Sequence, residues 1–447
     1  METEKENGNG DMMYQANKVF SEDIKSMHGE LRVPGDKSIS HRSVMLGSLA
    51  EGQTEVTGFL NSADCRSTIS CFRKMGILIK TEEENNKVYI SGRGLDGLRP
   101  ADGVLDTGNS GTTTRMISGI LAGQTFTSHL NGDASIQKRP MKRILEPLQE
   151  MGARISSDRG NDCAPLTIEP SPLRGITYHT KVASAQVKSC ILLAGLYAEG
   201  ETCVYEPALS RDHTERMLLA FGAKMDLDPE NKMARIYSRP KLLGQKIFVP
   251  ADISSAAYFL AAGLILPNSE ITLKDVNINP TRAGILSVIQ KMGGHLVIEN
   301  QRLLSGEEVA DLTVSSSSLH GCTIEGDLIP RLIDEIPVIA CMAAFADGDT
   351  EIKDASELRV KESDRIKSIC ENLLAMGADV EERPDGLRIH GGKELHGAPV
   401  KTYMDHRIAM AFTIAGLAVH GTVTLDHPSC VDISYPEFYD QVQLLIQ

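Results

Sequence analysis

Basic side chains stand where the sequence predicts the starts of helices, and they could hold the anionic groups of a small ligand. Lys37 and Ser38 follow Gly35-Asp36 at one such start, and Arg42 lies about one helical turn further on. Lysine and arginine suit a phosphate, because one supplies a compact charge and the other a bidentate fork of donors. The GxxxxGK[ST] spacing of a Walker loop is absent, which argues against nucleotide hydrolysis. The segment is either a phosphate-binding cradle or an ordinary exposed helix cap.

Four later cations occupy comparable positions: Arg139, Lys361, Arg365 and Arg407. Arg139 stands at the expected start of a helix, where a cation is unfavourable unless an anion binds nearby. Lys361 and Arg365 are four residues apart and are expected to share a helix face, although a solvated turn of mixed charge would show the same pattern. Cations at several unit starts of an acidic protein are explained most simply by ligands that carry two anionic groups, such as phosphates.

Two carboxylates near these cations are candidates for acid–base chemistry. Asp334 lies between apolar residues, so that partial burial and a raised pKa are expected. Glu362 belongs to the same basic segment as Lys361. The sequence offers no metal-binding constellation, which weakens the case for phosphoryl transfer, because that reaction usually relies on Mg²⁺.

Three polar segments allow two interpretations each. Residues 108–112 (GNSGT) could bring backbone N–H groups close to a ligand or form a plain tight turn. Ser184-Ala185-Gln186 could cap a helix, bind a polyol, or do both. Ser210 precedes the run RDHTE, for which a salt-bridged first turn is favoured over a metal or acid–base site.

These segments belong to a repeat of about 74 residues, in which an apolar helix, a strand and an amphipathic helix follow one another. The six first helices are predicted to begin near Lys37, Asn109, Ser184, Ser254, Asp334 and Asp405. The unit is too long for a solenoid, and two groups of three units predict two α/β domains. The boundary is expected near residues 245–252, where KIFVPADIS echoes LRVPGDKSIS of residues 31–40. The apolar first helices should be buried, with their N-termini facing one anion-binding cavity.

The composition of the 447 residues is typical of a soluble globular protein, with 41% apolar and 24% charged residues. A net charge of −14 argues against a general nucleic-acid binder. The longest apolar run, residues 256–266, falls short of the roughly 18 residues that span a bilayer. Nine dispersed cysteines fit buried thiols in a reducing compartment better than a disulfide framework. Residues 1–24 are expected to form a flexible tail.

Seven segments follow one another between Met27 and Leu445: PGDKSISHR, LDTGNSGTTTR, QKRPM, SAQVKS, IPRLIDEIP, RVKESDR and DHRIAMAF. In order and spacing they resemble the signature segments of the 5-enolpyruvylshikimate-3-phosphate synthases. The resemblance implies an α/β fold of two inverse α/β barrels, each made of three βαβαββ units with pseudo-threefold symmetry. It also implies that residues 36–250 form the first domain and that residues 25–35 join residues 251–447 in the second.

The resemblance further implies an activity in the shikimate pathway of aromatic amino acid biosynthesis. The enolpyruvyl group of phosphoenolpyruvate would pass to the 5-hydroxyl of shikimate 3-phosphate, with release of phosphate. Asp334 would accept the hydroxyl proton, Glu362 would protonate the enol carbon, and Lys37 would be an electrostatic or proton-transfer partner. Shikimate 3-phosphate would be bound by Lys37, Ser38, Arg42, Ser184, Ala185, Gln186, Ser210, Asp334 and Lys361. Phosphoenolpyruvate would be bound by Lys37, Gly111, Arg139, Gln186, Arg365 and Arg407.

No metal ion or organic cofactor is implied, because the C–O bond breaks and the P–O bond does not. The protein is expected to be a cytoplasmic monomer that binds neither nucleic acid nor a membrane. Two departures from the family pattern are visible: Ala185 stands where many members have a second serine, and residues 430–436 lack a lysine that many members carry. One hydroxyl contact and one phosphoenolpyruvate contact are thereby in question. The segments GDKS, SAQVK, RDHTE and NPTR resemble the glyphosate-tolerant subgroup, which implies weak inhibition by glyphosate.

Three other functions fit the sequence less well. UDP-N-acetylglucosamine enolpyruvyl transferase shares the fold and the chemistry, but most members use a catalytic-loop cysteine, and none occurs here between Cys71 and Cys163. A non-catalytic repeat scaffold would not need charged side chains at the unit starts. An RNA-end-processing enzyme is disfavoured by the acidic balance and by the lack of a basic, aromatic-studded face.

Overall fold

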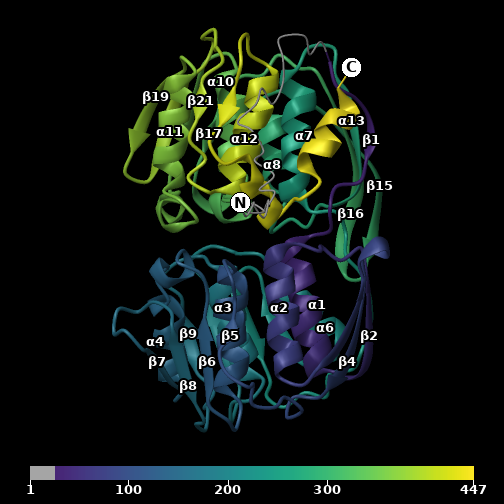
Figure 1. Ribbon diagram of the computed structural model, residues 1–447, viewed down its shortest axis with the longest axis vertical. Helices are drawn as coiled ribbons and strands as arrows, with labels where there is room; N and C mark the ends of the chain where they lie inside the picture. The colour runs from purple at the N-terminus through teal and green to yellow at the C-terminus, as the bar shows by residue number, and fades with distance from the viewer. Residues whose placement is uncertain (1–25, 447) are drawn as a thin grey trace, which may run out of the picture.

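The computed structural model describes residues 26–446, which form two bodies stacked along the long axis (Figure 1). Each body has its own core of buried apolar side chains. One core draws on residues 39–249, and the other draws on residues 27–33 together with residues 251–445. The flexible tail expected for residues 1–24 lies outside the described residues. The start of the described chain therefore packs with the second half of the sequence.

Three buried helices run through each body, at the positions predicted for the first helices of the units. They are α1 (Lys37–Leu49), α3 (Gly111–Ala122), α5 (Ala185–Gly195), α7 (Ile253–Ile265), α10 (Ile336–Ala344) and α12 (His406–Leu417). Small and aliphatic residues cover all sides of these helices, so that every side can pack against apolar neighbours. The prediction of buried first helices is confirmed.

A second, half-exposed helix follows in each unit. These helices are α2 (Ala63–Lys74), α4 (Lys142–Glu150), α6 (His213–Ala220), α8 (Gly284–Lys291), α11 (Arg365–Ala375) and α13 (Phe438–Leu445). A short α9 (Ile329–Leu332) precedes α10. Where the cap is a side chain, it fits the expected chemistry: Asp364, for example, accepts a hydrogen bond from the backbone N–H of Lys367 at the start of α11.

Two local expectations about these helix starts are wrong. Arg139 does not begin a helix: it is an extended residue after the 3₁₀ turn Ile136–Lys138, and α4 starts only at Lys142. Lys361 is also extended and follows the 3₁₀ turn Ser356–Val360, whereas Arg365 is the first residue of α11. Lys361 and Arg365 therefore do not share a helix face, and a common contact brings them together instead.

Between residues 26 and 446, six small sheets follow one plan, in which the first two strands of each are parallel and later neighbours are antiparallel. The first body has the orders β13-β2-β4-β3, β5-β6-β8-β7 and β9-β10-β12-β11, and the second has β1-β14-β16-β15, β17-β18-β20-β19 and β21-β22. The last sheet has only two strands, so the sixth unit is reduced relative to the predicted repeat.

The strand bounds in the first body are β2 (Glu51–Thr57), β3 (Leu78–Glu82), β4 (Lys87–Arg93), β5 (Leu105–Asp106), β6 (Ser128–Asn131), β7 (Arg154–Ser157), β8 (Leu166–Glu169), β9 (Thr177–His179), β10 (Thr202–Tyr205), β11 (Met225–Asp228), β12 (Met233–Ile236) and β13 (Lys246–Phe248). Those in the second body are β1 (His28–Leu31), β14 (Glu270–Asn277), β15 (His295–Leu304), β16 (Glu307–Ser315), β17 (Thr323–Ile324), β18 (Asp349–Ile352), β19 (Asp379–Arg383), β20 (Gly386–His390), β21 (Pro399–Val400) and β22 (Thr424–Leu425).

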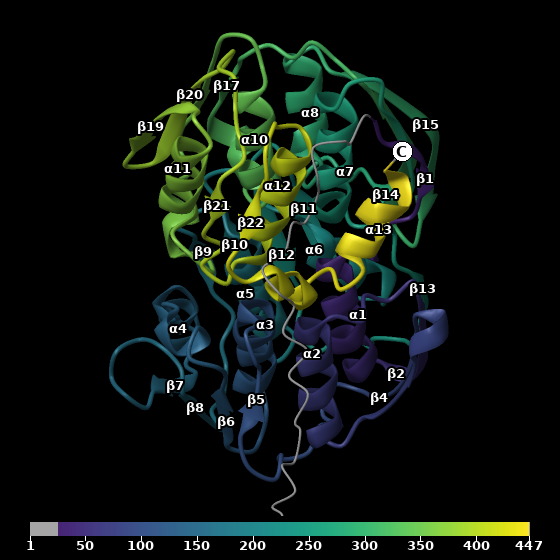
Figure 2. The same ribbon diagram turned by 45° about the horizontal axis from the view of Figure 1, so that its top comes forward.

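The chain crosses between the two bodies twice, at neighbouring points. After β1, which lies beside β14, the chain enters the first body, and after β13, which pairs with β2, it enters the second (Figure 2). The crossing segments exchange two backbone hydrogen bonds, from Asp36 to the Pro250 carbonyl (2.8 Å) and from Asp252 to the Pro34 carbonyl (2.9 Å). The Asp36 and Asp252 side chains then cap α1 and α7. Both crossings thus lead directly into helix N-termini at the junction.

Within residues 26–446, no helix has the length and apolar character needed to cross a membrane.

Candidate active site

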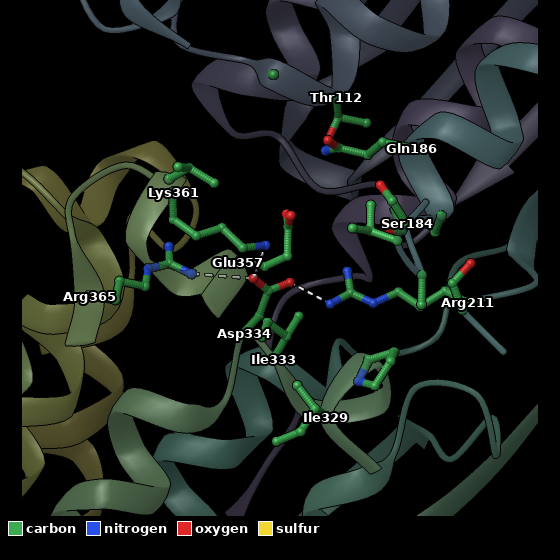
Figure 3. Close-up of a pocket in the computed structure, with 18 of the residues that line it drawn as sticks. Thr112, Ser184, Gln186, Arg211, Ile329, Ile333, Asp334, Glu357, Lys361 and Arg365 are labelled. Atoms are coloured by element: carbon green, nitrogen blue, oxygen red, sulfur yellow. Dashed lines mark hydrogen bonds and ion pairs between the residues drawn. The ribbon is translucent and has the colours of Figure 1, made fainter. Parts of the chain in front are cut away.

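A cavity of about 360 Å³ lies between the two bodies and receives side chains from both. Its wall is strongly charged, with nine Lys and Arg residues against six Asp and Glu residues in a chain of net charge −14. Apolar residues such as Ile329 and Ile333 cover one side of it (Figure 3). Concentrating positive charge in one cavity of an acidic protein favours an anionic ligand, because field lines are focused where the walls exclude water.

The first body supplies helix starts to this cavity. Lys37, the first residue of α1, forms an ion pair with Asp64 in the first turn of α2. The backbone N–H of Lys37 donates to Asp252 of the second body at 3.2 Å, so that the residue is held from both sides of the junction. Ser38, the next residue of α1, also lines the cavity. The N-terminus of α1, with its partial positive charge, therefore faces the space between the bodies.

Glu362 joins the two bodies through arginines. One of its carboxylate oxygens lies 3.3 Å from Arg139 Nη1 of the first body, and the other accepts a hydrogen bond from Arg365 Nη2 at 2.5 Å. Arg365 is almost fully buried and also donates to Asp405, the cap of α12, at 2.8 Å. Arg139 is held in addition by Asn109 at 2.7 Å. The glutamate thus occupies the space between two guanidinium groups.

Asp334 is the centre of a second ionic cluster (Figure 3). Its carboxylate lies 3.3 Å from Lys361 Nζ and accepts a hydrogen bond from Arg365 at 3.2 Å. Arg211 reaches the same carboxylate from the first body. Arg407 donates to the backbone carbonyl of Asp334 at 3.1 Å. This shared carboxylate, and not a common helix face, brings Lys361 and Arg365 together.

The expectation of a raised pKa for Asp334 is wrong. Burial alone would raise the pKa of this carboxyl, as its apolar sequence neighbours suggest. Surrounding cations lower the pKa more strongly, to well below its ordinary value; they are Lys361, Arg211, Arg407 and Arg365. Asp334 is therefore ionised at neutral pH and can accept a proton.

Glu362 is ionised for the same reason. Burial raises the pKa of its carboxyl, but the charges of Arg365, Arg139 and Lys361 lower it well below its ordinary value. A proton donor must first hold a proton, so Glu362 needs its arginines to be engaged elsewhere before it can donate. An anionic ligand on Arg139 and Arg365 would meet this condition.

Of the residues predicted for the site, all but one line this cavity: Lys37, Ser38, Gly111, Arg139, Ser184, Ala185, Gln186, Ser210, Asp334, Lys361, Glu362, Arg365 and Arg407. Arg42 is the exception. Its buried guanidinium donates to the Ser38 carbonyl at 3.0 Å, to Thr214 at 2.6 Å and to Ser189 at 2.9 Å. It therefore supports the start of α1 from behind, which corrects the expectation that it faces the ligand.

Sequence reasoning missed several charged residues of the wall: Asp64, Arg115, Arg143, Arg211, Asp252, Arg282, Asp354, Glu357 and His406. Arg211 carried a usable signal, because it lies two residues before the start of α6, in the charged run RDHTE. Arg115 follows Gly111 by about one helical turn and could have been placed on the same wall. The remaining residues had no signal, because their contacts join segments far apart in the sequence.

The arrangement suits proton transfer between two bound anions. Arg139 and Arg365 form one cation pair, while Lys361 and Arg211 belong to another, and an ionised carboxylate lies in each. None of the nine cysteines, all of which lie in the described part of the chain, lines the cavity, so no thiol nucleophile is available there. Residues 26–446 also contain no group of three His, Cys, Asp or Glu side chains placed to hold a metal ion.

Comparisons with known proteins agree with one another. Residues 21–442 match the family described as EPSP synthase (3-phosphoshikimate 1-carboxyvinyltransferase). The 3-phosphoshikimate 1-carboxyvinyltransferase of Synechococcus sp. (strain JA-3-3Ab) is 53% identical over 94% of this chain and 95% of its own. The enzyme of that name from Bacillus subtilis (strain 168) is 50% identical over 94% of this chain and 98% of its own.

A solved structure of EPSP synthase from Acinetobacter baumannii has a TM-score of 0.84 at 43% sequence identity, and the match covers 95% of this chain and 96% of that one. The likeness extends through both bodies. With its cation-rich cavity and six repeated units, the chain belongs to the EPSP synthase (3-phosphoshikimate 1-carboxyvinyltransferase) family.

Proposed function

We propose that the chain transfers the enolpyruvyl group of phosphoenolpyruvate to the 5-hydroxyl of shikimate 3-phosphate and releases phosphate. The observation that carries this proposal is the cavity between the bodies, in which two cation groups surround the ionised carboxylates Asp334 and Glu362. Two phosphorylated substrates need two cation groups, and the addition of a hydroxyl across an enol needs a proton acceptor and a proton donor.

Shikimate 3-phosphate is assigned to the cluster around Asp334. Its phosphate and hydroxyl groups would be held by Lys37, Ser38, Ser184, Gln186, Ser210 and Lys361, and Arg211 joins this set because it reaches Asp334 from the first body. The side chain of Ala185 is only a methyl group, so it can border the ligand but cannot form a hydrogen bond with it. Arg42 supports Ser38 through its backbone carbonyl and is assigned a structural part in the same subsite.

Phosphoenolpyruvate is assigned to the neighbouring pair Arg139 and Arg365. Lys37, Gly111, Gln186 and Arg407 line the cavity with them and complete the proposed subsite. Guanidinium groups hold phosphate and carboxylate oxygens in a bidentate manner, which fixes the position of the enol carbon atoms.

The proposed reaction proceeds by addition and elimination. Asp334 accepts the proton of the 5-hydroxyl while the hydroxyl oxygen bonds to C2 of the enol, and Glu362 gives a proton to C3. In the second step a C3 proton passes back to the Glu362 carboxylate, the C–O bond to phosphate breaks so that phosphate leaves, and the double bond re-forms. Lys37 stabilises the negative charge on the phosphate oxygens in both steps.

We also propose a division into domains at the two crossings, with residues 36–250 in one domain and residues 25–35 with 251–447 in the other. The pairing of β1 with β14, the pairing of β13 with β2 and the two separate cores support it. A cytoplasmic monomer that binds neither nucleic acid nor a membrane completes the proposal, and sedimentation of the purified protein would test the oligomeric state.

The function is tested by measuring phosphate release with both substrates. Wild type should release phosphate only when phosphoenolpyruvate and shikimate 3-phosphate are both present. Lys37→Met and Asp334→Ala should remain folded and lose at least about 100-fold in kcat, the usual scale for a lost acid–base or electrostatic group. Phosphate release with UDP-N-acetylglucosamine and not with shikimate 3-phosphate would establish the alternative enolpyruvyl transferase instead.

A further inference from the structure

Arg115 stands out among the charged residues of the cavity wall because its charge is not compensated. It lies in the second turn of α3, is 5% exposed and lines the cavity. Among the residues that the structure describes, every other Lys or Arg of this wall has a carboxylate oxygen within 4.0 Å, and Arg115 has none. A buried cation without a counter-ion is unfavourable, so a bound anion would stabilise Arg115 where the free protein does not.

The surroundings of Arg115 increase this imbalance. Burial is the largest influence and lowers the pKa of the guanidinium, and the neighbouring charges of Arg143 and Arg139 lower it further, to about 9. The group stays protonated at neutral pH, but three arginines then share one wall. Only Arg139 and Arg143 are paired, with Glu362 and Glu357 respectively. An incoming anion would therefore relieve repulsion as well as supply a partner.

The one strong hydrogen bond of Arg115 goes to a predicted ligand-binding residue. Its Nη1 donates to Gln186 Oε1 at 2.6 Å, and its Nη2 makes a longer contact of 3.4 Å with the Pro140 carbonyl. Arginine has only donors, so the oxygen of the Gln186 amide must face it. The amide nitrogen is thereby turned away, and it donates to Thr112 at 3.0 Å, at the start of α3. Arg115 thus fixes which end of the amide is offered to the cavity.

Arg115 and Arg139 also flank the same backbone position. A Cβ atom built on Gly111 would lie 3.1 Å from Nη1 of Arg115 and 3.2 Å from Nη1 of Arg139. The two guanidinium tips therefore approach the first residue of α3 from two sides, where the helix N-terminus adds its own partial positive charge. Gln186, Gly111 and Arg139 are all assigned to phosphoenolpyruvate above, and Arg115 is the residue that contacts or borders each of them.

We propose that Arg115 is a positioning residue of the phosphoenolpyruvate subsite. By holding the oxygen of the Gln186 amide, it leaves the amide N–H that does not bond to Thr112 for the substrate, and the anionic group of that substrate neutralises the charge of Arg115. This inference rests on the proposed function and adds a residue to it. The missing counter-ion distinguishes Arg115 from an arginine with a purely structural role, because such an arginine would be paired in the free protein.

The test combines kinetics with thermal unfolding for Arg115→Met, Arg115→Lys, Gln186→Met and the double variant Arg115→Met/Gln186→Met. Arg115→Met should raise KM for phosphoenolpyruvate by about 10- to 100-fold, the scale of a lost hydrogen bond to a charged group, and change KM for shikimate 3-phosphate by less than about threefold. Arg115→Lys should recover part of the loss. The double variant should be much less impaired than the product of the two single effects, because both changes disable the same amide.

Thermal unfolding distinguishes this role from a structural one. Because an unpaired buried charge is removed, ligand-free Arg115→Met should unfold at the same temperature as wild type or at a higher one. Inorganic phosphate, added with shikimate 3-phosphate, should raise the Tm of wild type more than that of the variant. A lower Tm with equal rises in both KM values, or an unchanged KM for phosphoenolpyruvate, would overturn the proposal. Inactivity of wild type would instead refute the proposed function, and the phosphate-dependent shift in Tm would still decide the role of Arg115.

Discussion

Replacing Glu362 with glutamine should tighten the binding of inorganic phosphate while it slows the reaction. In the free protein the Glu362 carboxylate lies 3.3 Å from Arg139 and 2.5 Å from Arg365, the two residues assigned to phosphoenolpyruvate. A phosphate group can reach these guanidinium groups only by displacing the carboxylate. Glu362 is thus both the proposed proton donor and a competitor of the substrate, and Glu362→Gln separates the two roles.

The size of the effect follows from the two contacts. A hydrogen bond to a charged group contributes about 1.5–3 kcal/mol, and a charge-assisted bond is roughly twice as strong as a neutral one. The two contacts use different carboxylate oxygens, and glutamine keeps only one acceptor oxygen, without the charge. About half of one contact therefore remains, and the other is lost because an amide nitrogen cannot accept a hydrogen bond. The competition then falls by about 2.3–4.5 kcal/mol in total, which corresponds to phosphate binding that is about 40- to 2,000-fold tighter.

Calorimetric titration with inorganic phosphate measures this effect directly. The protein is first saturated with shikimate 3-phosphate, so that phosphate can enter only the remaining subsite. Phosphate release in the presence of both substrates is measured in parallel, and kcat of Glu362→Gln should fall by at least about 100-fold, because the proton donor is lost.

A matched control comes from the same cavity. Glu357 pairs with Arg143 at 2.9 Å and is assigned to neither proposed subsite, so Glu357→Gln removes the same charge without freeing Arg139 or Arg365. Its phosphate affinity should stay within about threefold of wild type. The reasoning is wrong if Glu362→Gln binds phosphate no more tightly than wild type, or if Glu357→Gln tightens binding to the same extent.

Three further outcomes are expected. Burial lowers the pKa of His213, but Glu307, 2.7 Å away, raises this pKa more, to above 6.5, so the stabilisation of the folded state is complete below pH 6.5 and is lost as the pH rises. His213→Gln should therefore lower the Tm measured by calorimetry more near pH 6 than near pH 9, and equal losses at the two pH values would contradict this. The lowered pKa of Asp334 gives a stabilisation that is present above pH 3.8 and lost as the pH falls further, so acid titration of the unfolding free energy should be steeper for wild type than for Asp334→Asn. Glyphosate should inhibit phosphate release weakly, and a nanomolar inhibition constant against phosphoenolpyruvate would refute that expectation.

The sequence predicted the helices well because their signal is local. An apolar stretch such as Ile253–Ile265 can only be buried, and a polar residue before it, here Asp252, caps it whatever the rest of the chain does. The last unit shows the limit of a repeat argument. Its motif GTVTLDH predicts a strand like the others, but only Thr424–Leu425 pairs, with Pro399–Val400, in a two-stranded sheet.

The errors about the site have one physical origin. A raised pKa was expected for Asp334 because its sequence neighbours are apolar. The cations that lower the pKa, including Arg211 and Lys361, instead come from segments 27 to 123 residues away. Arg42 was assigned to the ligand from its place after Ser38, but Thr214 and Ser189 hold its guanidinium away from the cavity. Spacing along the chain gives the type of side chain at a helix start, and only the packing of distant segments gives its partners.

The place of β1 in the second body has a consequence for biosynthesis. The backbone N–H of Met27, just before β1, bonds to a residue that lies 242 positions later in the chain. At a synthesis rate of about 5–20 residues per second, the ribosome needs roughly 10–50 s to reach that residue. For nearly all of this interval the first body is still incomplete, because its core includes Ile247 and Val249, and β1 has no strand beside it. The nascent chain thus carries an unsatisfied strand edge ahead of the growing first body, which makes this interval the time at which a chaperone or a mispaired neighbouring chain can compete for β1.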